Sequence, residues 1–196
     1  MRILALHGYH GSGAILREQM APLRGALEHV AEFVYVDAPS LAQGDFGWWH
    51  AVDRGGIRYQ GWPRTRDWIV DLFEREKPFD GVFGFSQGAA LTGLLVGLRL
   101  PFNFAIVAGG FVADDTSLSD VYGARDAYAR PSVHLIGKRD SIITPRDSRE
   151  LSSRFDNPIV LEHDGGHIVP SAPNVVSGIE TFLARARQTA PSLRSR

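Results

Sequence analysis

The sequence predicts an α/β fold, with one parallel sheet of about six strands and helices covering both of its faces. Short apolar runs rich in Val, Ile and Phe alternate along the chain with longer amphipathic stretches. Runs that are apolar throughout are typical of strands buried on both faces, as in parallel sheets. Each return to a parallel strand needs a crossover, which is usually a helix. A chain of 196 residues that is 44% hydrophobic is long enough for one such domain.

The individual elements follow from these apolar runs and from the amphipathic stretches between them. Six strands are predicted, at Ile3–Leu6, Phe33–Val36, Gly81–Phe85, Phe104–Ala108, Val133–Ile136 and Ile159–Leu161. Five helices are predicted, at Ala14–His29, Arg66–Glu76, Gln87–Leu98, Pro145–Arg154 and Ala172–Arg187. Proline is tolerated at the start of a helix, which agrees with Pro145 and Pro173 near two of these starts.

Two long connections interrupt the alternation, at Ser40–Pro63 and Gly110–Arg130. Loops of that length are uncommon inside compact domains and are often functional. The first is rich in glycine and aromatic residues, namely Phe46, Trp48, Trp49, Tyr59 and Trp62. We expect residues 1–187 to form a single domain and residues 188–196 to form a polar tail.

The composition excludes several classes of protein. The formal net charge is −1 and there is no cysteine. We therefore expect no nucleic-acid partner, no disulfide framework and no zinc site built on thiolates. No apolar run approaches the length that a membrane span or a secretory signal needs. A soluble, cytoplasmic protein without a membrane span is expected, and its oligomeric state stays open.

Residues Gly84–Gly88 match the pattern G-x-S-x-G, the nucleophile elbow. The chemistry needs a serine on a sharp strand-to-helix turn, with small residues two positions before and after it. The context fits, because a predicted strand precedes Ser86 and a predicted helix follows it. The turn exposes the hydroxyl and leaves the backbone N–H of Gln87 at a helix start, where an oxyanion can form. We expect Ser86 to be a nucleophile.

A serine nucleophile needs a base and an acid that orients the base. In enzymes with this elbow the chain order is Ser, then Asp or Glu, then His. Asp140 ends one predicted strand, and His167 follows the next in a glycine-flanked loop. Both residues are therefore expected at the carboxyl edge of the sheet. His163 and Asp164 are weaker candidates, because of their places in or beside the strand.

The loop His7–Gly13 follows the first strand and opens a helix. One interpretation is a dinucleotide site, with Asp37 on the ribose, but the glycine spacing G-x-x-G-x-G differs from G-x-G-x-x-G. The favoured interpretation is an oxyanion loop, with the backbone N–H of Tyr9 as donor and that of His10 as the weaker candidate.

A metal site is a third interpretation of the same loop, with His7, His10 and His167 as ligands. No helix sets the spacing of these histidines, which makes this reading the weaker one. We expect no metal and no cofactor.

The chain resembles the family of serine hydrolases called FSH, whose members are distantly akin to acyl-protein thioesterases. The resemblance covers almost the whole chain, and its longest segment, Pro78–Leu91, is specific. Six segments carry it in the right order: LHGY from Leu6, VDAP from Val36, PFDGVFGFSQGAAL from Pro78, GGF from Gly109, IGKRD from Ile136 and EHDGGH from Glu162.

The resemblance implies a three-layer α/β-hydrolase sandwich, for which we expect the strand order 2-1-3-4-5-6. It also implies a catalytic triad of Ser86, Asp140 and His167, and an oxyanion hole formed by the N–H groups of Tyr9 and Gln87. The implied activity is ester or thioester hydrolysis, which in some relatives releases acyl chains from carrier domains.

The resulting expectation is a cofactor-free acyl hydrolase that acts on a small-molecule ester or thioester, or on an acyl chain bound to a carrier. Two alternatives remain: a non-catalytic binding protein with the same fold, and an acyltransferase that uses the same triad. Aromatic residues near the two long connections are the candidate substrate contacts, namely Trp48, Trp49, Tyr59, Trp62 and Phe111.

Overall fold

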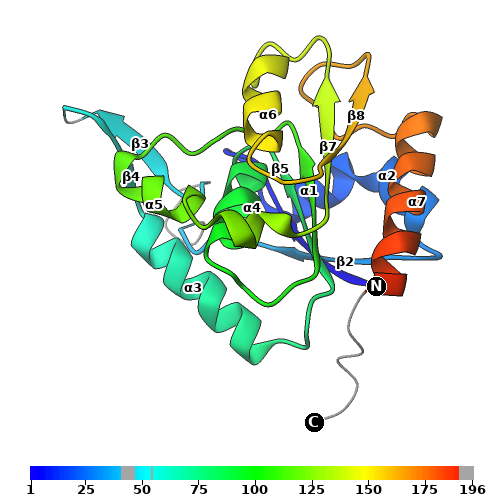
Figure 1. The fold of residues 1–196 in the computed structure, drawn as a ribbon, viewed down its shortest axis with the longest axis horizontal. Helices are drawn as coiled ribbons and strands as arrows, with labels where there is room; N and C mark the ends of the chain where they lie inside the picture. The colour runs from blue at the N-terminus through cyan, green and yellow to red at the C-terminus, as the bar shows by residue number, and fades with distance from the viewer. Residues whose placement is uncertain (41–46, 54, 190–196) are drawn as a thin grey trace.

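A six-stranded parallel sheet forms the centre of the computed structural model, which describes residues 1–40, 47–53 and 55–189 (Figure 1). Its strand order is β2-β1-β5-β6-β7-β8. Each pair of neighbours runs parallel. Strands β3 (His50–Asp53) and β4 (Ile57–Gln60) form a separate two-stranded sheet. Counted in chain order without them, the strands of the main sheet follow the order 2-1-3-4-5-6, which confirms the prediction. The strand bounds are β1 (Arg2–Leu6), β2 (Glu32–Val36), β5 (Gly81–Phe85), β6 (Phe104–Ala108), β7 (Ser132–Gly137) and β8 (Ile159–His163).

Helices cover both faces of this sheet, as predicted (Figure 1). One face packs against α1 (Gly13–Gln19), α2 (Ala21–Leu27) and α7 (Pro173–Thr189). The other packs against α3 (Trp62–Arg75), α4 (Gln87–Gly97), α5 (Ser119–Tyr122) and α6 (Pro145–Ser152). Strand β1 shows the alternation: Leu4 and Leu6 join the second cluster, whereas Ile3 and Ala5 join the first. Side chains alternate across a strand, so a strand between two helical layers must be apolar throughout.

The first predicted helix is two helices, which corrects the expectation of one helix over Ala14–His29. Helix α1 ends at Gln19 and α2 begins at Ala21, with Met20 between them. Pro22 lies in the first turn of α2. Proline lacks a backbone N–H and its ring collides with the preceding turn, so a single helix through Pro22 would be kinked or broken there.

Two other helix bounds also differ from the expectation. Helix α3 begins four residues early, at Trp62, directly after the left-handed Gly61. Helix α7 runs to Thr189, two residues beyond the predicted end at Arg187. Residues 190–196 lie outside the described residues.

The aromatic connection holds a β-hairpin that the sequence did not predict. Strands β3 (His50–Asp53) and β4 (Ile57–Gln60) pair antiparallel. Figure 1 shows this hairpin extending away from the main sheet, beyond the end of α3. Residues 41–46 and Arg54, and with them Phe46, lie outside the described residues.

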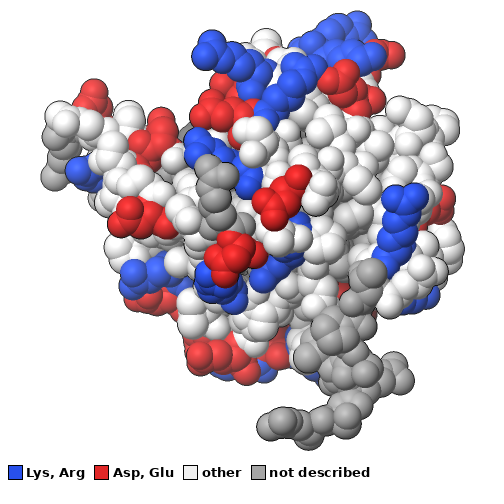
Figure 2. Space-filling model, viewed as in Figure 1, with Lys and Arg blue, Asp and Glu red and all other residues white. Residues whose placement is uncertain are grey.

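The second long connection contains α5 and two short 3-10 turns, Thr116–Leu118 and Arg125–Ala129. None of the helices in residues 1–40, 47–53 and 55–189 has the length and apolar content that crossing a bilayer requires. On the face shown in Figure 2, Lys and Arg gather over α6 and the ends of β7 and β8, with acidic groups among them. Ion pairs of Lys138 with Asp164 and of Arg149 with Glu162 belong to this region, which therefore has mixed charge.

Candidate active site

Ser86 lies on the sharp turn between β5 and α4. Its φ of 56° and ψ of −118° are unusual for a residue with a side chain. The flanking glycines make this turn possible: a Cβ on Gly84 would lie 2.2 Å from the carbonyl oxygen of Gly88, and a Cβ on Gly88 would lie 2.2 Å from that of Leu6. The Ser86 N–H donates to the Ala108 carbonyl at 2.9 Å. Neighbouring chain thus fixes the turn on both sides.

Ser86, His167 and Asp140 form one hydrogen-bonded chain. The distance from Ser86 Oγ to His167 Nε2 is 2.9 Å, and that from His167 Nδ1 to Asp140 Oδ2 is 2.7 Å. The other carboxylate oxygen of Asp140 accepts the N–H groups of Ile142 and Ile143, each at 2.9 Å. Asp140 is 6% exposed. In this arrangement the imidazole can take the serine proton while the carboxylate orients it.

Close packing orients the His167 ring. Its centroid lies 4.8 Å from that of Phe85, in a tilted arrangement. On another side is Gly109, where an added Cβ would lie 3.3 Å from two ring atoms of His167. Gly109 also has a positive φ of 55°. A residue with a side chain at position 109 would therefore crowd the His167 ring and strain its own backbone.

The loop after β1 lies beside Ser86. A Cβ on Gly8 would lie 3.2 Å from the Cβ of Ser86. Tyr9 follows directly, and Gln87 opens α4. Within residues 1–40, 47–53 and 55–189, no acceptor is bound to the backbone N–H of either Tyr9 or Gln87. Two free amide donors beside a serine hydroxyl are the groups that can stabilise an oxyanion.

A cavity of about 420 Å³ opens at Ser86. Its lining is mainly aromatic and aliphatic, consisting of Tyr9, Trp49, His50, Ala51, Tyr59, Ser86, Gln87, Phe111, Asp114, Ile142 and Ile143. Three of the five candidate substrate contacts, Trp49, Tyr59 and Phe111, are therefore in this lining. Trp48 and Trp62 are not in this lining, and Trp62 packs edge-on behind Trp49.

The family model described as "Serine hydrolase (FSH1)" matches residues 1–179. The chain belongs to this family. Esterase OVCA2 of Xenopus tropicalis is 32% identical over 201 residues, covering 87% of this chain and 86% of that protein. Esterase CG5412 of Drosophila melanogaster is 31% identical over 194 residues, covering 87% and 69%. In fold, the chain is similar to the crystal structure of Zea mays acyl-protein thioesterase 2, with a TM-score of 0.69, 18% identity and 93% of each chain covered.

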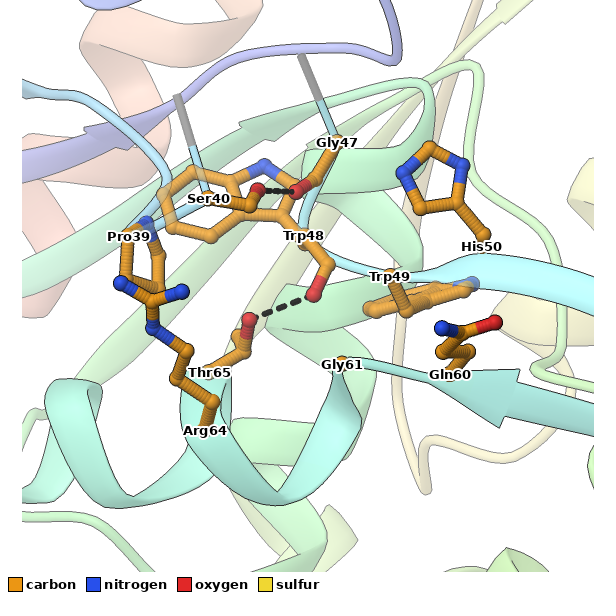
Figure 3. Close-up of a pocket in the computed structure, with 10 residues that line it drawn as sticks. All are labelled: Pro39, Ser40, Gly47, Trp48, Trp49, His50, Gln60, Gly61, Arg64 and Thr65. Atoms are coloured by element: carbon orange, nitrogen blue, oxygen red, sulfur yellow. Dashed lines mark hydrogen bonds between the residues drawn. The ribbon is translucent and has the colours of Figure 1, made fainter. Parts of the chain in front are cut away.

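In this serine hydrolase the side chain of Gln87 bridges the elbow and the aromatic segment. Its Oε1 accepts the Trp48 N–H at 2.8 Å, and its Nε2 donates to the Trp49 carbonyl at 2.9 Å. Figure 3 is a close-up of a second, smaller cavity, and it shows that Thr65 of α3 donates to the Trp48 carbonyl. The Trp48 indole N–H donates to the His7 carbonyl at 2.8 Å. One aromatic segment therefore connects α3, the elbow and the loop after β1.

The groups considered for a nucleotide or metal site have other partners. His7 Nε2 accepts the Ala38 N–H at 3.1 Å, and His7 Nδ1 donates to the Gly8 carbonyl at 2.7 Å. Burial lowers the pKa of His7, which keeps the ring neutral. Asp37 accepts the Gly13 N–H at 2.8 Å, at the start of α1. In the described part of the chain, no group of three or more His, Cys, Asp or Glu side chains is arranged to hold a metal ion.

The weaker candidates near the triad have structural partners. His163 is buried at the end of β8, where burial lowers its pKa, and its Nδ1 accepts the Gly165 N–H at 3.2 Å. Asp164 is exposed and pairs with Lys138 at 3.0 Å. His10, the weaker oxyanion candidate, is not in the cavity lining, whereas Tyr9 is.

Sequence reasoning missed Asp114, His50, Ile142 and Ile143, which also line the cavity. His50 Nδ1 lies 2.9 Å from the Tyr9 hydroxyl, a contact between residues 41 positions apart. No spacing rule predicts such a pair. Ile142 and Ile143 could have been predicted, because they lie two and three positions after Asp140, the expected acid.

Proposed function

We propose that this serine hydrolase cleaves acyl esters or thioesters through an acyl-enzyme, with Ser86 as nucleophile. In the proposal His167 is the general base and then the general acid, and Asp140 orients its imidazole. The observation that carries the proposal is the continuous hydrogen-bonded chain from Ser86 Oγ through His167 to Asp140. The strained elbow and the two free amide donors support the same assignment.

The proposed reaction has two halves. Ser86 Oγ attacks the carbonyl carbon as its proton moves to His167 Nε2, and the oxyanion accepts the N–H groups of Gln87 and Tyr9. The carbon–oxygen or carbon–sulfur bond then breaks, and His167 gives its proton to the departing alcohol or thiol. Water, deprotonated by His167, attacks the acyl-enzyme and releases the acid, and the proton returns to Ser86. Removing one oxyanion donor costs about 10²–10³ in kcat in comparable enzymes.

The cavity supports an apolar acyl group as the substrate part that it binds. Aromatic and aliphatic side chains make up most of its lining, and pockets of this kind bind apolar groups through burial. The proposed leaving group is a small alcohol, a small thiol or the thiol of an acyl-carrier domain.

A fluorophosphonate probe tests the nucleophile. We expect the wild-type protein to be labelled and Ser86→Ala not to be labelled. Ser171→Ala is the matched control, since Ser171 is an exposed serine outside the cavity lining. Labelling of Ser86→Ala at the wild-type rate would overturn the proposal, and a folded wild-type protein that takes no label would favour the non-catalytic binding protein.

A turnover panel separates hydrolysis from acyl transfer. Aryl esters and acyl thioesters of increasing chain length are supplied with and without an added alcohol or amine, and one arm presents the same acyl chain on a carrier domain. Release of free acid in every arm supports hydrolysis. A product in which the acyl chain is on the added alcohol or amine identifies the acyltransferase alternative.

A further inference from the structure

Asp114 places a carboxylate in the lining of the cavity at Ser86. It shares the lining with Ser86, Trp49, Tyr59 and Phe111. Of the described residues in that lining it is the one Asp, Glu, Lys or Arg. The Asp114 side chain is exposed although it lines the cavity, so solvent reaches its carboxylate. An apolar acyl chain gains nothing from such a group, whereas a polar end of the chain can use it as a hydrogen-bond acceptor.

Tyr59 holds Asp114 in place. The Tyr59 hydroxyl donates to Asp114 Oδ1 at 2.5 Å and accepts the backbone N–H of Asp114 at 2.9 Å. Burial and the hydrogen bond to Asp114 raise the pKa of Tyr59, so its hydroxyl stays a donor. The Tyr59 ring stacks on Trp49, with centroids 4.7 Å apart and planes 10° apart. A rigid aromatic pair thus fixes one carboxylate oxygen at the wall of the cavity.

The cation of Arg58 in β4 pairs with Asp115, the residue after Asp114. Arg58 donates to Asp115 Oδ1 at 3.4 Å and also to the Thr116 hydroxyl. Asp115 is buried and accepts the Tyr59 N–H at 2.7 Å and the Ser117 N–H at 2.8 Å. Across residues 1–40, 47–53 and 55–189, no Lys or Arg forms an ion pair with Asp114. Among these residues, an ion pair with Lys or Arg therefore does not neutralise the charge of Asp114.

On the basis of the ester or thioester hydrolysis proposed above, we propose that Asp114 selects acyl groups that end in a hydroxyl and rejects acyl groups that end in a carboxylate. The aromatic lining binds the body of the acyl chain, and the free oxygen of Asp114 accepts the terminal hydroxyl. A charged acceptor makes a stronger hydrogen bond than a neutral one. A carboxylate at the same place is repelled, which costs about tenfold for two unit charges ~4 Å apart at an effective dielectric constant of ~60, between the ~20 of a protein surface and the ~80 of water.

Three aryl esters with one leaving group and matched acyl length test this proposal. Their acyl chains end in a hydroxyl, a methoxy group or a carboxylate. We expect the wild-type protein to show the highest kcat/KM with the hydroxyl-ended ester and a value at least about tenfold lower with the carboxylate-ended ester. In Asp114→Asn, which keeps an oxygen for Tyr59, we expect the ratio of these two values to fall to about threefold or less. Because a ratio compares two substrates on the same sample, loss of folded protein does not change it.

The control variant is Asp120→Asn, which removes the same charge from an exposed residue of the same connection outside the cavity. It should keep the wild-type ratio. Raising the ionic strength from about 0.02 to about 0.5 M should shrink the wild-type ratio and leave that of Asp114→Asn almost constant. An unchanged ratio in Asp114→Asn, or equal hydrolysis of the hydroxyl-ended and carboxylate-ended esters by the wild type, overturns the proposal. Hydrolysis of none of the three esters would overturn the proposed function instead.

Discussion

Ser86 has a positive φ, a backbone conformation that a residue with a side chain keeps only where its surroundings hold it. Here the Ala108 carbonyl binds its N–H, and the backbone packs closely at Gly84 and Gly88. The strain is confined to this turn, and it places the Ser86 hydroxyl beyond the end of the strand, within hydrogen-bond distance of His167. Rigid placement of this kind reduces the reorganisation that a reaction needs.

At the scale of single residues, Asp140→Asn tests the role of the acid. We expect kcat to fall by about 10³–10⁴, because the amide can stabilise the wrong tautomer of the His167 ring and cannot balance its charge. The fold should be kept, since the new side chain retains an oxygen that can accept the N–H groups of Ile142 and Ile143. Steady-state turnover of an aryl ester measures kcat, and far-UV circular dichroism checks the fold. A folded variant within tenfold of wild type contradicts the assignment.

At the scale of elements, the segment Trp48–Trp49 depends on the Gln87 side chain. Gln87→Met has a similar length but leaves the Trp48 N–H and the Trp49 carbonyl without their partners. Each unpaired buried group costs about 1–3 kcal/mol. We expect a fall in Tm of about 4–24 °C, at about 2–4 °C per kcal/mol for a chain of this size. KM should rise more than kcat falls, because the cavity wall moves while the backbone N–H of the same residue stays in place.

Gln87→Glu is the comparison for this variant. It keeps the acceptor for Trp48 and loses the donor for Trp49, so its Tm should lie between those of wild type and Gln87→Met. Thermal unfolding followed by circular dichroism gives the order of the three. Equal Tm values for Gln87→Met and wild type would show that the bridge contributes nothing.

The aromatic residues Trp49 and Trp62 have different roles at the cavity. Trp49 lines the cavity, whereas Trp62 packs behind it with ring centroids 6.0 Å apart. Trp49→Ala should shift the preferred acyl chain to a longer one, because it enlarges the cavity. Trp62→Ala should lower stability by about 3–5 kcal/mol with little change in that preference. The chain-length profile with aryl esters and the urea midpoint measure the two effects, and a larger shift of the profile in Trp62→Ala would contradict this division.

At the scale of the whole molecule, a buried histidine makes stability depend on pH. His134 in β7 is 1% exposed, its Nε2 lies 3.1 Å from Ser132 Oγ, and its ring meets Phe155 edge-on. Burial lowers its pKa from 6.5 to about 3. Between pH ~3 and pH ~6.5 the His134 ring is therefore protonated in the unfolded chain and neutral in the folded chain. Stability should rise with pH across this window and level off above it.

His134→Leu tests this linkage. Removing the titrating ring should reduce the slope of unfolding free energy against pH by up to about 1.4 kcal/mol per pH unit between pH 4 and 6. Urea unfolding at a series of pH values gives both slopes. The matched control is His29→Leu, since His29 is an exposed histidine on the surface. Identical slopes for His134→Leu and wild type would contradict the prediction.

The central sheet and the three residues Ser86, Asp140 and His167 could be predicted from the sequence, whereas the walls of the cavity could not. The six strands are continuous apolar runs, and the elbow has a fixed spacing, so local patterns were sufficient. Strands β3 and β4 are short and half exposed, and they are defined by pairing with each other. The contacts of Gln87 with Trp48 and of Tyr59 with Asp114 join residues 39 and 55 positions apart. Such contacts arise from tertiary packing, which single-sequence patterns do not record.

The hairpin of β3 and β4 projects from the rim of the molecule and takes no part in the central sheet. Ser86, Asp140 and His167 come after β5, β7 and β8, and none of the three belongs to the hairpin. Mutations in the hairpin can therefore change the cavity wall at His50, Ala51 and Tyr59 without replacing any of these three residues. During evolution, substrate preference can therefore change through mutations in this short hairpin, while Ser86, Asp140 and His167 stay the same.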